Sequence, residues 1–315
     1  MTAYAGFQQE TQKVFGAACF ILKMSCYAEK RRAFLMKIFI ITDLEGVAGI
    51  SVDQQLNGID NPYYRKAREF LADEINAAVA GAKDAGATEF LIADGHGTGY
   101  DMMLDFDRID ADVTFVTGNG NPMDAVDDSF SAAFIIGQHP KKGVRGSLEH
   151  TGSHMVNQGM WLNDIEVGEA GLLTSVLGEK NIPLALLTGD EETIKEMVPL
   201  SHGFVGVAVK RGITRNLCVT LHPATARKMI KDGACRAIQS LSAISPWKLS
   251  PPFTLVIKYA ASEIAEKYAS FGLCDTGKEN TLFPYIARVN ENTLRVTAPT
   301  LHELYRRYYL MNRVV

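Results

Sequence analysis

Short apolar runs and helical patterns alternate along most of the chain. The apolar runs have the length and the β-branched content of buried strands. They lie at residues 37–42, 88–94, 113–117 and 132–137. Between the first two, Asn61-Pro62 supplies a helix cap and a first-turn proline, and apolar residues follow at helical spacing from Phe70 to Ala82. This alternation predicts an α/β fold, a mostly parallel sheet with helices on both faces.

The pattern changes beyond about residue 140. Residues 160–167 are typical of a hairpin that turns at Asn163-Asp164, and a helix over 168–177, a strand over 183–188 and a helix starting at Asp190 follow. After about residue 203 the pattern predicts two more strands and two more helices. These are strands at 204–209 and 254–258, and helices at about 222–243 and 299–311. We interpret this last part as a smaller α+β C-terminal domain.

The first 35 residues differ from the rest. Their apolar patch, 14–24, precedes the basic segment 29–32, whereas a secretory signal has the opposite order. Met36 stands directly before the first predicted strand. We therefore expect an N-terminal extension over 1–35 that is separate from the fold, a larger α/β domain over 36–202, and the smaller domain over 203–315.

Composition narrows the class of protein. The 315 residues are 47% apolar and 22% charged, with a net charge of −4, which is ordinary for a globular chain. Nothing in this charge favours nucleic acid or a membrane surface as a partner, and no apolar run reaches about 18 residues. The five cysteines include no C-x-x-C pair, so we expect neither a zinc-thiolate site nor a disulfide framework, and a cytoplasmic location.

Acids and histidines follow the predicted strands. Asp43 and Glu45 come after the first strand, His96 after the second, His139 after the fourth, and Glu169 opens a helix. Because ligands of open α/β sheets lie at the carboxyl ends of the strands, we expect these side chains to converge. Carboxylates with imidazoles suit zinc. Five ligands exceed the usual three of one catalytic zinc, and instead favour two metals about 3.5–4 Å apart.

Two other groups of polar residues carry open alternatives. His150 is either a general acid or base near the metals or a surface loop histidine, and His154 competes for the same role. Lys210, Arg211 and Arg215 either contact a substrate carboxylate or a neighbouring subunit, or form a solvated basic face.

Several segments together carry a family resemblance. They are Ile38–Gly49, Ala93–His96, Gly137–His139, Leu148–Thr151, Asn163–Gly171, Thr188–Asp190 and Val207–Lys210. In order and spacing they resemble the zinc D-aminopeptidases of the DppA type, from residue 36 to the C-terminal helix. The resemblance implies hydrolysis of an N-terminal D-residue from short peptides, and assembly of identical subunits into a ring, decameric in that family.

The resemblance also implies roles for the candidate residues. Asp43 would bridge two Zn²⁺ ions in each subunit. Glu45 and His96 would complete one metal, His139 and Glu169 the other. His150 matches the catalytic histidine of the family, although one extra residue between His150 and Glu169 keeps His154 as an alternative.

Two other functions stay open. One is another dinuclear metallohydrolase, acting on L-peptides, amides or esters. The other is a non-enzymatic, metal-binding protein that forms rings. Structural zinc sites are closed and four-coordinate, so five ligands with a nearby histidine favour an open, reactive site.

Overall fold

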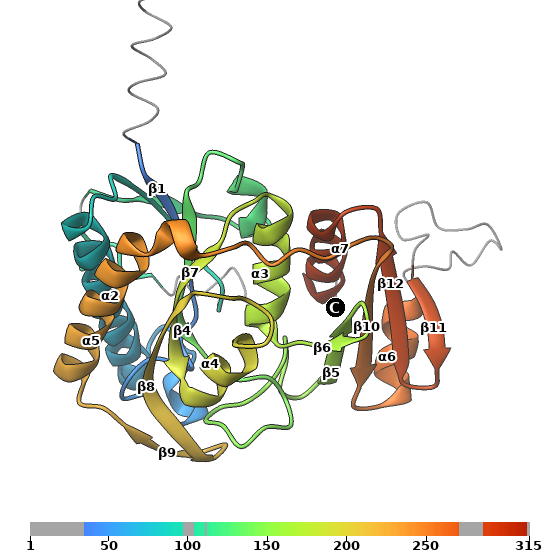
Figure 1. Cartoon of the computed structure of the whole chain (residues 1–315). Helices are drawn as coiled ribbons and strands as arrows, with labels where there is room; N and C mark the ends of the chain where they lie inside the picture. The colour runs from blue at the N-terminus through green and yellow to red at the C-terminus, as the bar shows by residue number, and fades with distance from the viewer. Residues whose placement is uncertain (1–34, 97–103, 111, 271–285, 314–315) are drawn as a thin grey trace, which may run out of the picture. The chain divides into compact units, whose positions relative to one another are not determined.

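The computed structural model describes residues 35–96, 104–110, 112–270 and 286–313 (Figure 1). The expected N-terminal extension, except for its last residue, lies outside the described residues. Within the described ranges, no helix combines the length and apolar character needed to cross a membrane.

The larger of the two sheets has seven strands, in the order β3-β2-β1-β4-β7-β8-β9. All neighbours pair in parallel except β8 and β9, which are antiparallel. The strands are β1 (Lys37–Thr42), β2 (Glu89–Asp94), β3 (Thr114–Val116), β4 (Ala132–Gln138), β7 (Leu184–Asp190), β8 (Val205–Thr214) and β9 (Leu217–Thr220). The mostly parallel α/β sheet expected from the sequence is confirmed.

Helices cover both faces of this sheet (Figure 1). Helices α2 (Pro62–Asp84) and α5 (Pro223–Gln239) pack together, and α3 (Glu169–Glu179) and α4 (Glu191–Met197) lie across the sheet from them. Successive residues of β8 show this division, because Gly206 faces Ile194 of α4 and Val207 faces Gly233 of α5. The helix expected over about 222–243 ends earlier, at Gln239, and a short 3₁₀ turn, η3 (Leu241–Ala243), follows.

A five-stranded antiparallel sheet has the order β11-β12-β10-β5-β6. Its strands are β5 (Asn157–Leu162), β6 (Ile165–Glu166), β10 (Phe253–Tyr259), β11 (Ile286–Asn290) and β12 (Thr293–Ala298). Helix α6 (Ser262–Ser270) packs on this sheet, and α7 (Leu301–Arg313) packs on it and on α3. The hairpin turns at Asn163-Asp164 as expected, and both residues adopt positive φ, 45° and 67°.

The two sheets do not divide the chain at residue 203. β8, β9 and α5 follow that position and belong to the seven-stranded sheet, whereas β5 and β6 precede it and belong to the antiparallel sheet. Local patterns show where elements begin, but the pairing of distant strands decides which sheet they join. A shared hydrophobic core then joins α3, α7 and both sheets.

Candidate metal centre

Three neighbouring strands end at the same level of the sheet. In the register of β1, Thr42 lies opposite Asp94 of β2 and Ile136 of β4. The residues that follow these positions, Asp43, His96 and His139, therefore meet at one edge, as the sequence predicts.

Asp43 occupies the middle of the site. Its Oδ1 atom lies 3.3 Å from Nδ1 of His96, and its Oδ2 atom lies 3.3 Å from Nε2 of His139. Gln138 donates a hydrogen bond from Nε2 to the same Oδ2 atom at 2.8 Å. The two carboxylate oxygens thus face different histidines, which is the placement that a bridging ligand requires.

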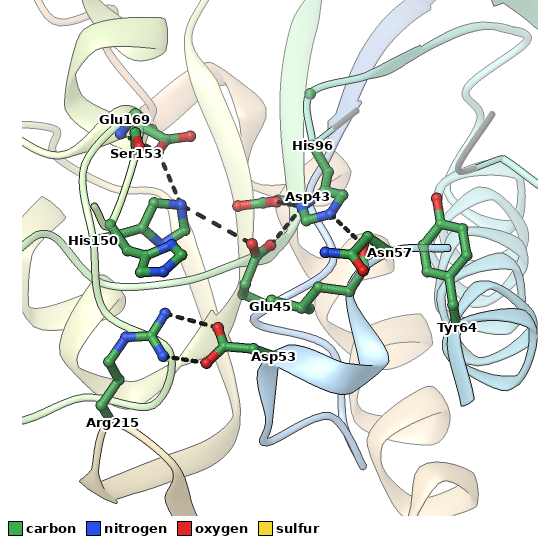
Figure 2. A pocket seen from close by; sticks show the side chains of 14 residues that line it. Asp43, Glu45, Asp53, Asn57, Tyr64, His96, His150, Ser153, Glu169 and Arg215 are labelled. Carbon is green, nitrogen blue, oxygen red and sulfur yellow. Dashed lines mark hydrogen bonds and ion pairs between the residues drawn. The ribbon is translucent and has the colours of Figure 1, made fainter. Parts of the chain in front are cut away.

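Potential ligand atoms form two clusters around this carboxylate, and Figure 2 labels Asp43, Glu45 and His96 of the first and His150 and Glu169 of the second. In the first cluster, Oε2 of Glu45 lies 2.8 Å from Nδ1 of His96. In the second, Oε1 of Glu169 lies 3.3 Å from Nε2 of His139 and 3.7 Å from Nε2 of His150. The atoms that Asp43, Glu45 and His96 offer all lie within 4.8 Å of one another, as do those of His139, His150 and Glu169. All the expected site residues are therefore brought together.

A backbone carbonyl anchors one nitrogen of each histidine. The pairs are His96 Nε2 with Leu56 at 3.0 Å, His139 Nδ1 with Pro140 at 3.0 Å, and His150 Nδ1 with Leu148 at 2.9 Å. A carbonyl only accepts, so the anchored nitrogen carries the hydrogen. In the neutral ring the other nitrogen then presents its lone pair to the carboxylate cluster, an orientation typical of metal-ligating histidines.

The pKa values of the buried groups show a site built for positive charge. Burial and the neighbouring Glu45 raise the pKa of Asp43 to about 7. Burial opposes a charge on His139, yet Glu169 and Asp43 raise its pKa to about 10. Burial likewise disfavours the carboxylate of Glu169, yet His139 lowers its pKa to about 2. Without another cation, protonated histidine balances the crowded carboxylates.

His150 differs from the other two histidines. Its ring stacks on that of His139, with centroids 3.8 Å apart and planes 14° apart. Burial and the charge of His139 lower its pKa to about 4, so the ring is neutral at pH 7. His150 lines the cavity, whereas His139 is 3% exposed and lies behind it. A molecule in the cavity can therefore contact His150.

The loop that carries His150 is fixed by its backbone. The His150 amide donates to the carbonyl of Pro140 at 3.2 Å, and the Leu148 amide donates to the carbonyl of Arg215 at 2.7 Å. Leu148 adopts a φ of +54°, which is uncommon for a residue other than glycine. The loop is thus held between the end of β4 and the turn after β8.

A cavity of about 300 Å³ opens in front of the site. Its walls include residues that the strand-end argument does not reach. These are Asp53, Leu56, Asn57, Tyr64, Ser153, His154 and Arg215. The ring centroid of His154 lies 6.3 Å from that of His150. Loops, a 3₁₀ turn and one helix bring these residues to the site, and of them the sequence indicates only His154 and Arg215 as candidates.

The three basic residues of β8 and its turn have different surroundings. Lys210 is buried, and its Nζ atom donates to the backbone carbonyls of Glu45 and Ile50, the latter at 2.7 Å. Arg211 is exposed and lies 3.9 Å from Glu191, and Arg215 lines the cavity. A solvated basic face, one alternative from the sequence, is therefore wrong for Lys210.

Fold and site together define an α/β protein with two adjoining carboxylate–imidazole clusters at the carboxyl edge of its sheet. Such pairs of clusters are typical of two-metal hydrolases. A family model described as D-aminopeptidase matches residues 36–309. The chain therefore belongs to the D-aminopeptidase family of peptidases, and the family and enzyme class expected from the sequence are confirmed.

Two similar proteins agree with this assignment. A D-aminopeptidase of Bacillus subtilis (strain 168) is 28% identical over 220 residues, which cover 69% of this chain and 78% of the relative. The structure of the Zn-dependent D-aminopeptidase DppA from Bacillus subtilis, described as a self-compartmentalizing protease, matches with a TM-score of 0.78 and 24% identity. That match covers 88% of this chain and 96% of DppA, and confirms the fold.

Proposed function

We propose that this protein uses two zinc ions to remove N-terminal D-residues, such as D-Ala, from short peptides or amides. The position of Asp43, with one oxygen towards each cluster, carries the proposal. The donor set fits two zinc ions, since carboxylate oxygens and imidazole nitrogens are the ligands that zinc takes. The similar DppA structure is described as Zn-dependent.

The residues divide between two metal positions around Asp43. Glu45 and His96 would hold one ion, His139 and Glu169 would hold the other, and Asp43 would bridge them. When bound, two zinc ions supply an activated water near neutral pH and polarise the scissile carbonyl group. The anchoring carbonyls of Leu56 and Pro140 keep both histidine rings in the orientation that this requires.

His150 is the catalytic residue of the proposal. Because its Nδ1 hydrogen is bound to the Leu148 carbonyl, its Nε2 atom is free to take up a proton and deliver it to the leaving amine. The same atom, once protonated, can donate a hydrogen bond to the oxyanion of the tetrahedral intermediate. Its Nε2 atom lies farther from Oε1 of Glu169 than that of His139 does, at 3.7 Å against 3.3 Å, which supports this role over that of a metal ligand.

Assembly and location extend the proposal. DppA is described as self-compartmentalizing, and we propose that this chain also forms a homo-oligomer, a ring of ten subunits as the resemblance implies. We place it in the cytoplasm, because its sequence has no C-x-x-C pair and no disulfide framework.

The test compares peptides of opposite chirality. Purified protein supplied with Zn²⁺ is expected to hydrolyse D-Ala-D-Ala and to leave L-Ala-L-Ala intact, with free alanine as the measured product. If the protein hydrolyses the L-peptide or esters faster than D-Ala-D-Ala, it is another kind of metallohydrolase and the proposal is wrong. Zinc binding without turnover of any of them would favour the non-enzymatic alternative.

A further inference from the structure

An ion pair borders the cavity beside the metal centre. The guanidinium of Arg215 donates from NH1 to Oδ2 of Asp53 at 2.7 Å and from NH2 to Oδ1 at 2.9 Å. Figure 2 shows this pair next to Glu45 and His150, on the side of Glu45 away from Asp43. The Arg215 side chain is 25% exposed, so it is accessible from the cavity.

One edge of the Arg215 guanidinium makes no hydrogen bond to the described residues. NH1 donates to Asp53 and, at 3.1 Å, to Oδ1 of Asn216, and NH2 donates once to Asp53. Nε and the second NH2 hydrogen form the other edge of the fork, and neither has a hydrogen-bond partner among the described residues. This edge has the geometry for bidentate binding of a second carboxylate.

The charges around the cavity make this edge the place for an anion. The described lining residues include four carboxylates, from Asp43, Glu45, Asp53 and Glu169. Among the lining residues of the described chain, Arg215 is the one lysine or arginine. A short peptide carries a carboxylate at the end opposite its N-terminal amine, and the unpaired edge of Arg215 can donate two charged hydrogen bonds to that group.

The cavity is large enough to hold both ends of a short peptide. At about 300 Å³ it lies at the lower end of the range of small-molecule sites. The Leu148 amide bonds to the Arg215 carbonyl, so the turn that carries Arg215 adjoins the loop that carries His150. A peptide that places its scissile bond near His150 can then reach this turn with its C-terminus.

We propose that Arg215, held in place by Asp53, binds the free C-terminal carboxylate of short peptide substrates. This inference rests on the proposed function and adds the substrate class, namely short peptides with an unblocked C-terminus. The enzyme would thus hold substrates at two points, the scissile bond at the metals and the C-terminal carboxylate at the guanidinium.

The test uses two substrates that differ in one group, D-Ala-D-Ala and its C-terminal amide. Arg215→Gln is expected to lower kcat/KM for the free acid by about 10–100-fold, mainly through a higher KM, because a charged bidentate contact is lost. The amide is expected to be hydrolysed as by the wild type. Arg215→Lys keeps the charge but not the two parallel donors of the guanidinium. Its kcat/KM for the free acid is expected to lie between those of the wild type and Arg215→Gln. The exposed neighbour Arg211, changed to Gln, is the matched control and is expected to affect neither substrate.

The ratio of the two kcat/KM values is independent of how much protein is folded, because both substrates are measured on the same preparation. An equal loss for acid and amide in Arg215→Gln would overturn the inference and make the ion pair with Asp53 purely structural. No loss for either substrate would also overturn it. In both cases hydrolysis by the wild type would leave the proposed function standing, whereas no hydrolysis of either substrate would overturn both.

Discussion

Asp43 connects the two halves of the site at the scale of single residues. Its two oxygens are equally far, at 3.3 Å, from one histidine on each side, and Gln138 fixes one of them. No other described carboxylate lies this close to both His96 and His139. The chemistry of the site therefore depends on the orientation of this one side chain.

The stacked pair His139 and His150 allows the roles of ligand and catalyst to be separated. His139→Ala is expected to lose one of two bound zinc ions, because its Nε2 atom faces both Asp43 and Glu169. His150→Ala is expected to keep both ions and to lose about 10²–10⁴-fold in kcat. Zinc content by elemental analysis and D-Ala-D-Ala hydrolysis are measured on the same samples. Loss of zinc from His150→Ala would instead make His150 a ligand.

Glu74 makes stability depend on pH. Its side chain is 2% exposed, and Oε1 accepts from the Ala48 amide at 2.9 Å, while Oε2 has no partner in the described part of the chain. Burial raises its pKa from 4.5 to about 7. Between these values the folded protein holds a proton that the unfolded chain has released, so the free energy of unfolding falls as the pH rises.

We expect this loss to reach about 3 kcal/mol above pH 7 and to vanish in Glu74→Gln. Urea unfolding at pH 5 and pH 8 measures it, after subtraction of the pH dependence that the variant retains. The exposed residue Glu89, changed to Gln, is the control and is expected to behave as the wild type. The same pH dependence in Glu74→Gln as in the wild type would show that Glu74 is not its source.

At the scale of elements, β8 supports the loop that carries two of the proposed ligands. Lys210 of β8 reaches under this loop and donates to the carbonyls of Glu45 and Ile50. Burial lowers the pKa of Lys210. The loop also lies against β4 at Gly46, where a Cβ atom would come within 2.2 Å of the Gln138 carbonyl. The loop is thus held from two neighbouring elements.

Lys210→Met is therefore expected to weaken zinc binding and to destabilise the fold by about 2–4 kcal/mol, because two buried carbonyls lose their donor. Competition with a zinc chelator and urea unfolding measure the two effects. Arg211→Met, next in the strand but exposed, is the matched control and is expected to change neither. Zinc affinity equal to that of the wild type in Lys210→Met would show that the loop keeps its shape without the ammonium group.

Local sequence predicts the elements whose ends carry a physical signal. The side chains of Asn61 and Asp190 cap their helices by accepting from the amides of Tyr63 and Glu192, as expected. The strands β11 and β12 have no such signal, since β11 is mostly exposed and is held by pairing with β12. Long-range pairing also decides that β8 joins the parallel sheet. The expected division at residue 203 instead assigns β8 to the C-terminal domain.

The sequence also predicts the candidate ligands, but it does not predict most of the residues that line the cavity. Asp43 and His139 stand directly after strands and His96 stands two residues after one, so the parallel order of the sheet places them together. Gln138 is the last residue of β4, next to His139, so its position at the site can be predicted in the same way. Asp53 and Tyr64 reach the cavity through a 3₁₀ turn, η1 (Asp53–Gln55), and the start of α2, and only the folded chain shows this.

At the scale of the whole molecule, α7 links the antiparallel sheet to the elements around the candidate metal centre. Helix α7 packs on α3, whose first residue is Glu169. The Tyr308 hydroxyl of α7 lies beside Gly152, where a Cβ atom would come within 2.0 Å of it. Gly152 in turn donates from its amide to Oε1 of Glu169 at 2.6 Å. The C-terminal elements therefore help to position a proposed zinc ligand.

The central claim is that two zinc ions, joined by Asp43, make this chain a D-aminopeptidase. The most direct measurement removes metal with a chelator, adds Zn²⁺ back in steps, and follows D-Ala-D-Ala hydrolysis at each step. The activity is expected to reach its plateau at two equivalents of zinc per chain, and Asp43→Ala is expected to stay inactive throughout. A plateau at one equivalent, or wild-type activity in Asp43→Ala, would contradict the two-metal site.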